Sequence, residues 1–163
     1  MLTEQRGRIC VRADLAQHDP RDARLKQIET EFLEERVRTL RRVLDTQSRR
    51  TDAVGGDASG TAATRRDVLM ARRREVQILE DLLHAPERQH RHLECVLGDR
   101  LRHADQSVSQ MSSLVSFKGR CDEVCWNAKM ERQVVAKILA DWWRWLRRRA
   151  ADEVDKHAES TTA

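Results

Sequence analysis

The sequence predicts an all-α protein built from long amphipathic helices, in part a coiled coil, that form a helical hairpin or a small bundle. Three observations favour this class. Hydrophobic residues make up 39% of the chain and charged residues 36%, so the core is thin and the surface is crowded with charge. Apolar side chains recur every three or four residues along most of the sequence. No stretch alternates apolar and polar residues between turn signals, as a strand would.

A first helix is predicted over residues 22–50, after a flexible N-terminal arm at residues 1–21. Proline disfavours helix in the residue before it, so Pro20 marks the boundary, and Asp19 or Asp22 is suited to cap the new helix. The apolar residues of this segment gather within about half of a helical circumference, which predicts one buried face. They are Leu25, Ile28, Phe32, Leu33, Val37, Leu40, Val43 and Leu44.

A flexible linker is predicted at residues 51–64, because its glycines and small polar residues bury too little surface to offset the entropy of ordering. A second helix follows from Arg65 to His84, with Thr64 as its N-cap. Pro86 then breaks or kinks the chain, or starts the next helix at its first turn. The apolar side of this second helix comprises Val68, Leu69, Val76, Leu79, Leu82 and Leu83.

Residues 65–156 as a whole are predicted to be a helical and coiled-coil region with breaks near residues 86 and 119, followed by a frayed tail at residues 157–163. After the first break, apolar residues step by three and four, which is the pattern of a coiled-coil seam. The seam comprises Leu93, Leu97, Leu101, Ala104, Val108, Met111 and Val115. After the second break, a last helix runs from Asp122 and carries a cluster of tryptophans.

Three of the four tryptophans lie within residues 141–149, beside a dense run of arginines. The apolar face of this helix has three interpretations: the core of a bundle, an anchor in a partner's groove, or a membrane-surface helix. A narrow core face would leave Trp143 half exposed, so we predict a partner or self-association surface. Its residues are Val135, Ile138, Leu139, Trp142, Trp143, Trp145 and Leu146.

Two clusters of arginine supply the chemistry to bind phosphate, in nucleic acid or in anionic lipid. They are Arg72, Arg73 and Arg74, and then Arg144, Arg147, Arg148 and Arg149. The alternative is that neighbouring acidic residues neutralise both clusters. The net charge is only +4 because acidic residues are interleaved with the basic ones. A dedicated nucleic-acid binder would separate the two signs more cleanly.

The sequence predicts no enzyme, no catalytic residue and no cofactor. Its histidines and carboxylates lie outside any glycine-rich turn, nucleophile elbow or phosphate loop. A zinc site would require two separate helices to come into register, and the alternative is that the cysteines are small, reduced core residues. The ligands of that zinc site would be His90, His92, Cys95, Cys121 and Cys125. No metal site is therefore predicted.

Three segments resemble one known family. They are residues 18–21 before the first helix, residues 65–74 at the start of the second, and residues 98–106 in the third. In this order they are similar to the small herpesvirus tegument proteins encoded by the fourteenth unique-long gene, over residues 18–110. The resemblance implies a minor virion protein that acts in particle assembly and in transport of other viral proteins, with chaperone-like behaviour and no catalytic residues. The tryptophan-rich C-terminal part lies outside it.

Together these patterns predict a non-enzymatic helical adaptor or scaffold, because helices in a chain of this size cover their apolar faces only by pairing. The expected partners are other helical proteins, in a homo- or hetero-oligomer. Two alternatives stay open: an arginine-rich binder of nucleic acid or an anionic membrane surface, and a structural subunit of a cytoskeletal or mitochondrial assembly. The resemblance implies that the protein is located in the virion tegument and in the host cytoplasm and nucleus. Without it, the lack of a spanning segment or signal peptide predicts a cytoplasmic protein.

Overall fold

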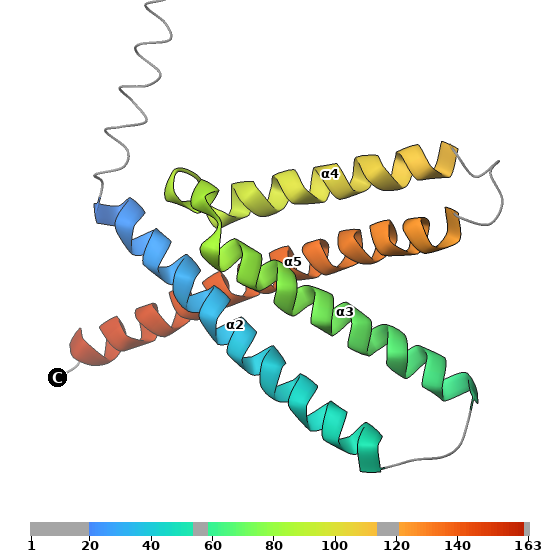
Figure 1. The fold of residues 1–163 in the computed structure, drawn as a ribbon. Coiled ribbons are helices and arrows are strands. Elements are labelled where there is room, and N and C mark those ends of the chain that lie inside the picture. The colour runs from blue at the N-terminus through green and yellow to red at the C-terminus, as the bar shows by residue number, and fades with distance from the viewer. Residues whose placement is uncertain (1–19, 54–58, 114–120, 162–163) are drawn as a thin grey trace, which may run out of the picture.

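The computed structural model describes residues 20–53, 59–113 and 121–161, and nearly all of these residues are helical (Figure 1). They form the α-helices α2 (Pro20–Ala53), α3 (Ser59–His84), α4 (Leu93–Ser113) and α5 (Cys121–Thr161), with a short 3-10 helix η1 (Pro86–Gln89) between α3 and α4. The described residues contain no strand. The predicted all-α class is confirmed.

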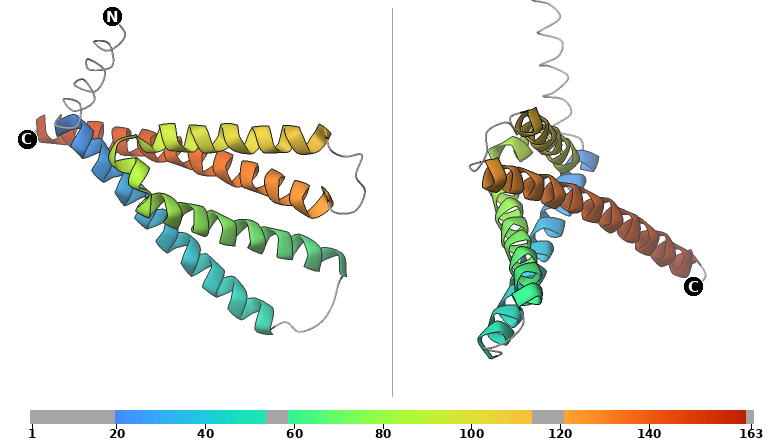
Figure 2. Two further views of the ribbon diagram at one scale, coloured as in Figure 1. Left: turned by 45° about the horizontal axis from the view of Figure 1, so that its top comes forward. Right: turned by 90° about the vertical axis from the view of Figure 1, so that its right-hand side faces the viewer.

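The helices pair into two antiparallel hairpins, α2 with α3 and α4 with α5 (Figures 1 and 2). The hairpins meet where the middle of α5 crosses α2 and the C-terminal part of α3. From this junction the α2–α3 hairpin and the α4–α5 hairpin extend in different directions, so that their tips are apart (Figure 2). The described helices therefore form an open V, and α2, α3, α4 and α5 come together at its junction.

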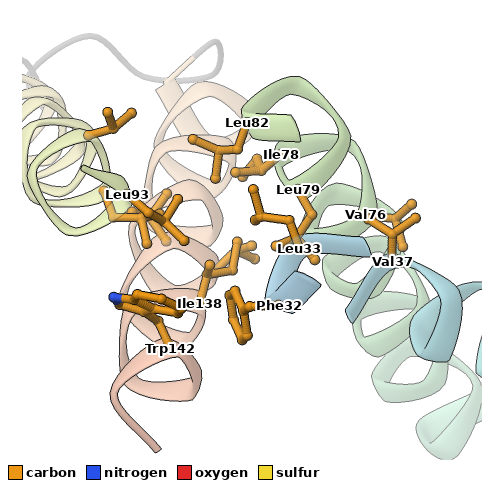
Figure 3. Close-up of a cluster of buried hydrophobic side chains, with 14 of the residues drawn as sticks. Phe32, Leu33, Val37, Val76, Ile78, Leu79, Leu82, Leu93, Ile138 and Trp142 are labelled. Carbon is orange, nitrogen blue, oxygen red and sulfur yellow. The ribbon is translucent and has the colours of Figure 1, made fainter. Parts of the chain in front are cut away.

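The hydrophobic core lies at this junction, and every α-helix contributes to it (Figure 3). Its largest side chain is Trp142 of α5, which is 2% exposed and lies against Phe32 of α2 with ring centroids 5.2 Å apart. Such tilted aromatic pairs add a favourable electrostatic contact to the buried area. The buried apolar residues are Phe32, Leu33, Val37, Leu40, Val76, Ile78, Leu79, Leu82, Leu93, Val96, Leu97, Val134, Val135, Ile138 and Trp142.

The helices extend further than the sequence predicts. α2 ends at Ala53, and α3 begins at Ser59, so much of the predicted linker at residues 51–64 is helical and only residues 54–58 fall outside the described part. Alanine has the highest helix propensity, and it occurs at both edges of this segment. The predicted tail at residues 157–163 is helical to Thr161, because α5 contains no proline or glycine that would end it earlier. The N-terminal arm lies outside the described residues, apart from Pro20 and the residue after it.

The long helices are interrupted at Pro86. α3 ends at His84, and Pro86 begins η1, where its missing N–H is not needed for a helical hydrogen bond. The predicted break near residue 119 lies outside the described residues. The N-terminal part of the predicted seam of α4 faces the junction, with Leu93 and Leu97 fully buried. Val115 lies outside the described residues, and a coiled coil along the seam stays a prediction.

The connection between the two hairpins is held against α2. Lys26 of α2 donates hydrogen bonds to the backbone carbonyls of Arg88 and Arg91. The carboxylate of Glu29, which is 1% exposed, accepts a hydrogen bond from the backbone N–H of Leu93 at 2.9 Å. A carboxylate at this position satisfies an unpaired N–H of the first turn of α4 and complements the helix dipole.

Arg88 of η1 is itself buried and fixes the same connection from inside. Its Nη2 donates to Oγ1 of Thr30 at 2.9 Å, and its Nη1 donates to the carbonyl oxygen of Leu82 at 3.3 Å. Burial lowers the pKa of the Arg88 guanidinium from its ordinary value, whereas the charge of Glu29 acts in the opposite direction. The turn between the hairpins is thus held by polar contacts as well as by the buried Leu82 and Leu93 on either side of it.

Gly98 offers a first test of the fold. It lies within α4, and a Cβ added there would meet no heavy atom within 4 Å. Gly98→Ala is therefore expected to raise the free energy of unfolding by about 0.5–1 kcal/mol, because glycine loses more backbone freedom in a helix than alanine. Urea denaturation followed by circular dichroism measures this change. Lower stability in the variant would contradict the placement of Gly98 within a regular, open part of α4.

Candidate functional site

The tryptophan face that the sequence predicts as a partner surface belongs to the protein's own core. Val135, Ile138 and Trp142 are at most 2% exposed. Leu139, Trp145 and Leu146 are half-buried and pack against the same core. The prediction is wrong for these residues because α2 and α3 cross α5 at this point and cover the face, so the core interpretation holds instead. Trp143, at 43% exposure, lies outside the core.

A network of charged side chains lies beside the core and joins three helices. The carboxylate of Glu75 on α3 is 3% exposed. It accepts hydrogen bonds from Arg36 of α2 at 3.1 Å and from Lys137 of α5 at 2.8 Å to each oxygen. Arg36 also donates to Asp141 of α5 at 2.7 Å. No sequence motif indicates this network, since its members come from three separate helices.

A small cavity of about 230 Å³ lies next to this network. Its charged residues include Arg36 and Arg144, and both are already paired with Asp141. The remaining lining residues are Phe32, Glu35, Trp145 and Arg148. Because the principal charges here neutralise one another, the cavity is part of the structural network and not the best candidate for a binding site.

The structure gives several members of the predicted arginine clusters acidic partners. Arg74 pairs with Glu131 at 2.6 Å, Arg144 with Asp141 at 2.6 Å, and Arg149 with Glu31 at 2.5 Å. Arg73, Arg147 and Arg148 are exposed, and Arg72 is half-buried. The pairs of Arg74 and Arg149 join different helices, so part of each cluster stabilises the junction.

No group of three or more histidine, cysteine, aspartate or glutamate residues within the described ranges is placed to hold a metal. Cys95 is exposed and Cys125 half-buried, both as free thiols, and the side chain of Cys121 lies outside the described part. His92 contacts carboxylates of α2: its Nε2 lies 2.6 Å from Asp22 Oδ1, and its Nδ1 lies 3.1 Å from Glu29 Oε1. This histidine therefore helps to hold α4 against α2.

A groove of about 960 Å³ lies along the α4–α5 hairpin and reaches the residues that join α3 to α4. Its apolar lining residues are Ala104 and Met111 of α4 and Val124, Ala128 and Met130 of α5. Its polar lining residues are Arg74, Glu87, Arg91, Asp99, Arg100, His103, Ser107, Asn127 and Glu131. Most of the apolar residues are buried or half-buried, whereas several charged ones are exposed. An apolar centre with a polar edge is the usual composition of a protein interface.

One edge of this groove carries a charged cluster of its own. Asp99 accepts hydrogen bonds from Arg91 and Arg102, and these bonds hold the pKa of its carboxyl group below the ordinary value. Arg74 and Glu131 form the ion pair that links α3 to α5 at the other edge. These contacts fix both edges of the groove without filling its apolar centre.

The groove continues the apolar stripe of α5 beyond the core. Val124, Ala128, Val135, Ile138 and Trp142 share one face of the helix at about 100° per residue. At the junction this face is buried, but toward the tip α3 diverges from α5 (Figure 2), and Val124 is 49% exposed. No described helix covers this part of the stripe. Val124 and Ala128 are not among the residues predicted from the sequence for the partner surface, although the same periodicity extends to them.

The fold and the groove together define an all-α protein of two crossed helical hairpins with an open apolar face on the second hairpin. Comparison with protein families, curated proteins and solved structures finds no match to this chain. Among the described helices, none has an apolar stretch long enough to cross a membrane.

Proposed function

We propose that the chain is a non-enzymatic helical adaptor that binds an amphipathic helix of a partner protein in the groove of the α4–α5 hairpin. The observation that supports this most is the uncovered apolar stripe of α5, which continues directly from the core. A helix bound there would bury Val124 and Met111 and would extend the packing of the junction toward the tip. Recognition of an amphipathic helix by an apolar groove is a recurrent mode of protein binding.

The proposed surface lies on the same helix as the tryptophan cluster but closer to its N-terminus. Trp142 and Trp145 pack against Phe32 of α2, which joins the two hairpins and thereby sets the position of the groove. On the resemblance to the herpesvirus tegument family, we further propose that the partner is a viral protein carried during virion assembly. A cytoskeletal or mitochondrial partner would use the same groove. The identity of the bound protein distinguishes a viral partner from a cytoskeletal or mitochondrial one.

Val124→Asp tests the groove. Because Val124 is half exposed, an aspartate at this position leaves the fold intact but places a charge among apolar contacts. We expect partner binding to weaken by at least tenfold, on the order of 1.4 kcal/mol. The measurement is affinity purification of the intact chain with cross-linking, in which cross-links to the partner should map to the groove.

Val154→Asp is the matched control, since Val154 is 67% exposed on the same helix and lies outside the groove. It should retain the partner. If both variants lost the partner equally, or both retained it equally, the groove would not be the binding site. Sedimentation velocity of the purified chain identifies the case in which the partner is a second copy, because Val124→Asp would then lower the mass of the assembly.

A further inference from the structure

The distal part of the α2–α3 hairpin concentrates the positive charge of the chain. Residues 38–73 contain nine arginines and four aspartates, with no lysine or glutamate, which gives this segment a charge of +5. The whole chain carries +4, so all other residues together carry −1. The modest charge of the whole chain therefore hides a strongly basic segment.

The fold places part of this charge on one exposed stripe. Arg38, Arg42 and Arg49 of α2 are all exposed, and at 100° per residue they lie within about 40° of one another, with the exposed Asp45 as the one acidic residue on the same stripe between them. Leu40 and Leu44, which turn toward the core, lie on the opposite side of the same helix. The stripe is about 16 Å long at the rise of an α-helix, a length of about five base pairs of a duplex.

The arginines of α3 extend this surface around the hairpin. Arg41 of α2 forms an ion pair with Glu80 of α3, which marks the side on which the two helices meet. Arg73 lies two helical turns before Glu80, and Arg66 lies four turns before it. Around the axis of α3, both positions are therefore within about 40° of the position of Glu80. Both are exposed. They therefore lie on the side marked by the Arg41–Glu80 pair, next to the stripe that includes Arg38.

The second arginine-rich segment, at the C-terminal end of α5, has no comparable excess of charge. Residues 141–156 contain five basic and four acidic residues. Two of the arginines, Arg144 and Arg149, pair with Asp141 and Glu31. The α2–α3 hairpin is thus the surface on which an anionic partner would find unbalanced positive charge.

The composition of this hairpin also indicates which polyanion fits. Residues 38–73 contain no phenylalanine, tryptophan or tyrosine, so stacking on the bases of a single strand is not available. None of the exposed residues of α2 between positions 38 and 50 is apolar, and α3 adds only Val68 and Met70, which are too few to form the apolar face of a membrane-surface helix. Guanidinium groups match phosphate oxygens in a planar, bidentate geometry.

We infer that the basic surface of the α2–α3 hairpin binds the phosphate backbone of double-stranded nucleic acid without reading base sequence. The three arginines of the α2 stripe supply the central contacts, and Arg66 and Arg73 add contacts at its side. Since this surface lies on the α2–α3 hairpin and most of the groove lies on the α4–α5 hairpin, the chain can hold a nucleic acid and a helical protein at the same time.

The test uses the intact chain and a fluorescent 20-base-pair DNA duplex, with binding followed by anisotropy over a range of salt concentrations. The triple variant Arg38→Gln, Arg42→Gln and Arg49→Gln is expected to lose at least tenfold in affinity. Its plot of log affinity against log salt should become shallower by about 3, because each lost phosphate contact removes about 0.9 from the slope. The matched control replaces by Gln the exposed Arg147 and Arg148 and also Arg132, which pairs with Asp105 of α4 at 2.6 Å; it removes the same charge from α5 and should change affinity by less than threefold.

Equal loss in the two triple variants would overturn the inference, because binding would then follow net charge alone. Tighter binding of a single strand of the same length would also overturn it. So would binding to vesicles containing phosphatidylserine with no binding to the duplex. Circular dichroism of each variant shows that its fold is retained. Val124→Asp should leave duplex binding unchanged, so the inference and the proposed adaptor function fail separately.

Discussion

Trp142→Ala is expected to lower the free energy of unfolding by about 3–5 kcal/mol, a large share of the total stability of a domain. Trp142 is 2% exposed and lies against Phe32 at the point where α5 crosses α2. Removing the indole opens a cavity between the two hairpins, and the surrounding helices cannot close around it without losing other contacts. Urea denaturation followed by circular dichroism gives the size of the loss.

Trp143→Ala is the matched control, because the neighbouring tryptophan is 43% exposed and lies outside the core. Its free energy of unfolding should change by no more than about 0.5 kcal/mol. Two adjacent tryptophans are thus expected to differ several-fold in their effect on stability. Similar effects from both replacements would show that the crossing of α5 over α2 is placed incorrectly.

Glu75→Gln is expected to lower the free energy of unfolding by about 2–3 kcal/mol. The change removes the shared negative charge that Arg36 and Lys137 contact from two other helices. The loss falls below that of a fully buried ion pair because both cations are partly exposed and regain water. The same denaturation measurement applies.

Glu80→Gln provides the comparison for this network. Its pair with Arg41 also joins α2 to α3, but the two side chains are 35% and 64% exposed. Solvent screens such a pair, so its loss should cost between zero and about 1 kcal/mol. If Glu75→Gln were no more destabilising than Glu80→Gln, the buried network would not contribute to holding the three helices in register.

Much of the fold follows from local sequence pattern. The three- and four-residue spacing of apolar residues predicts each long helix, and Pro86 predicts the turn between the hairpins. The ends of helices are less well predicted. Composition alone suggested a linker at residues 51–64, although residues next to an established helix extend it at little cost when they include alanine.

The candidate site was harder to predict because it depends on which helices meet. Periodicity shows that α5 has an apolar face, but the same stripe is buried at Trp142 and exposed at Val124. That difference is set by the crossing of α2 and α3, which the sequence of α5 does not encode locally. The same applies to the charge network, whose members Arg36 and Glu75 are 39 residues apart and Glu75 and Lys137 are 62 apart.

The position of the core has a consequence for biosynthesis. Phe32 and Trp142 are neighbours in the finished core, yet one is made early and the other late (Figure 3). While the ribosome is still translating α5, the first hairpin emerges with the part of its apolar face that α5 later covers still exposed. Such long-range closure slows folding and leaves nascent apolar surface open to aggregation. The partially synthesised chain is therefore a natural client for cellular chaperones until α5 leaves the exit tunnel.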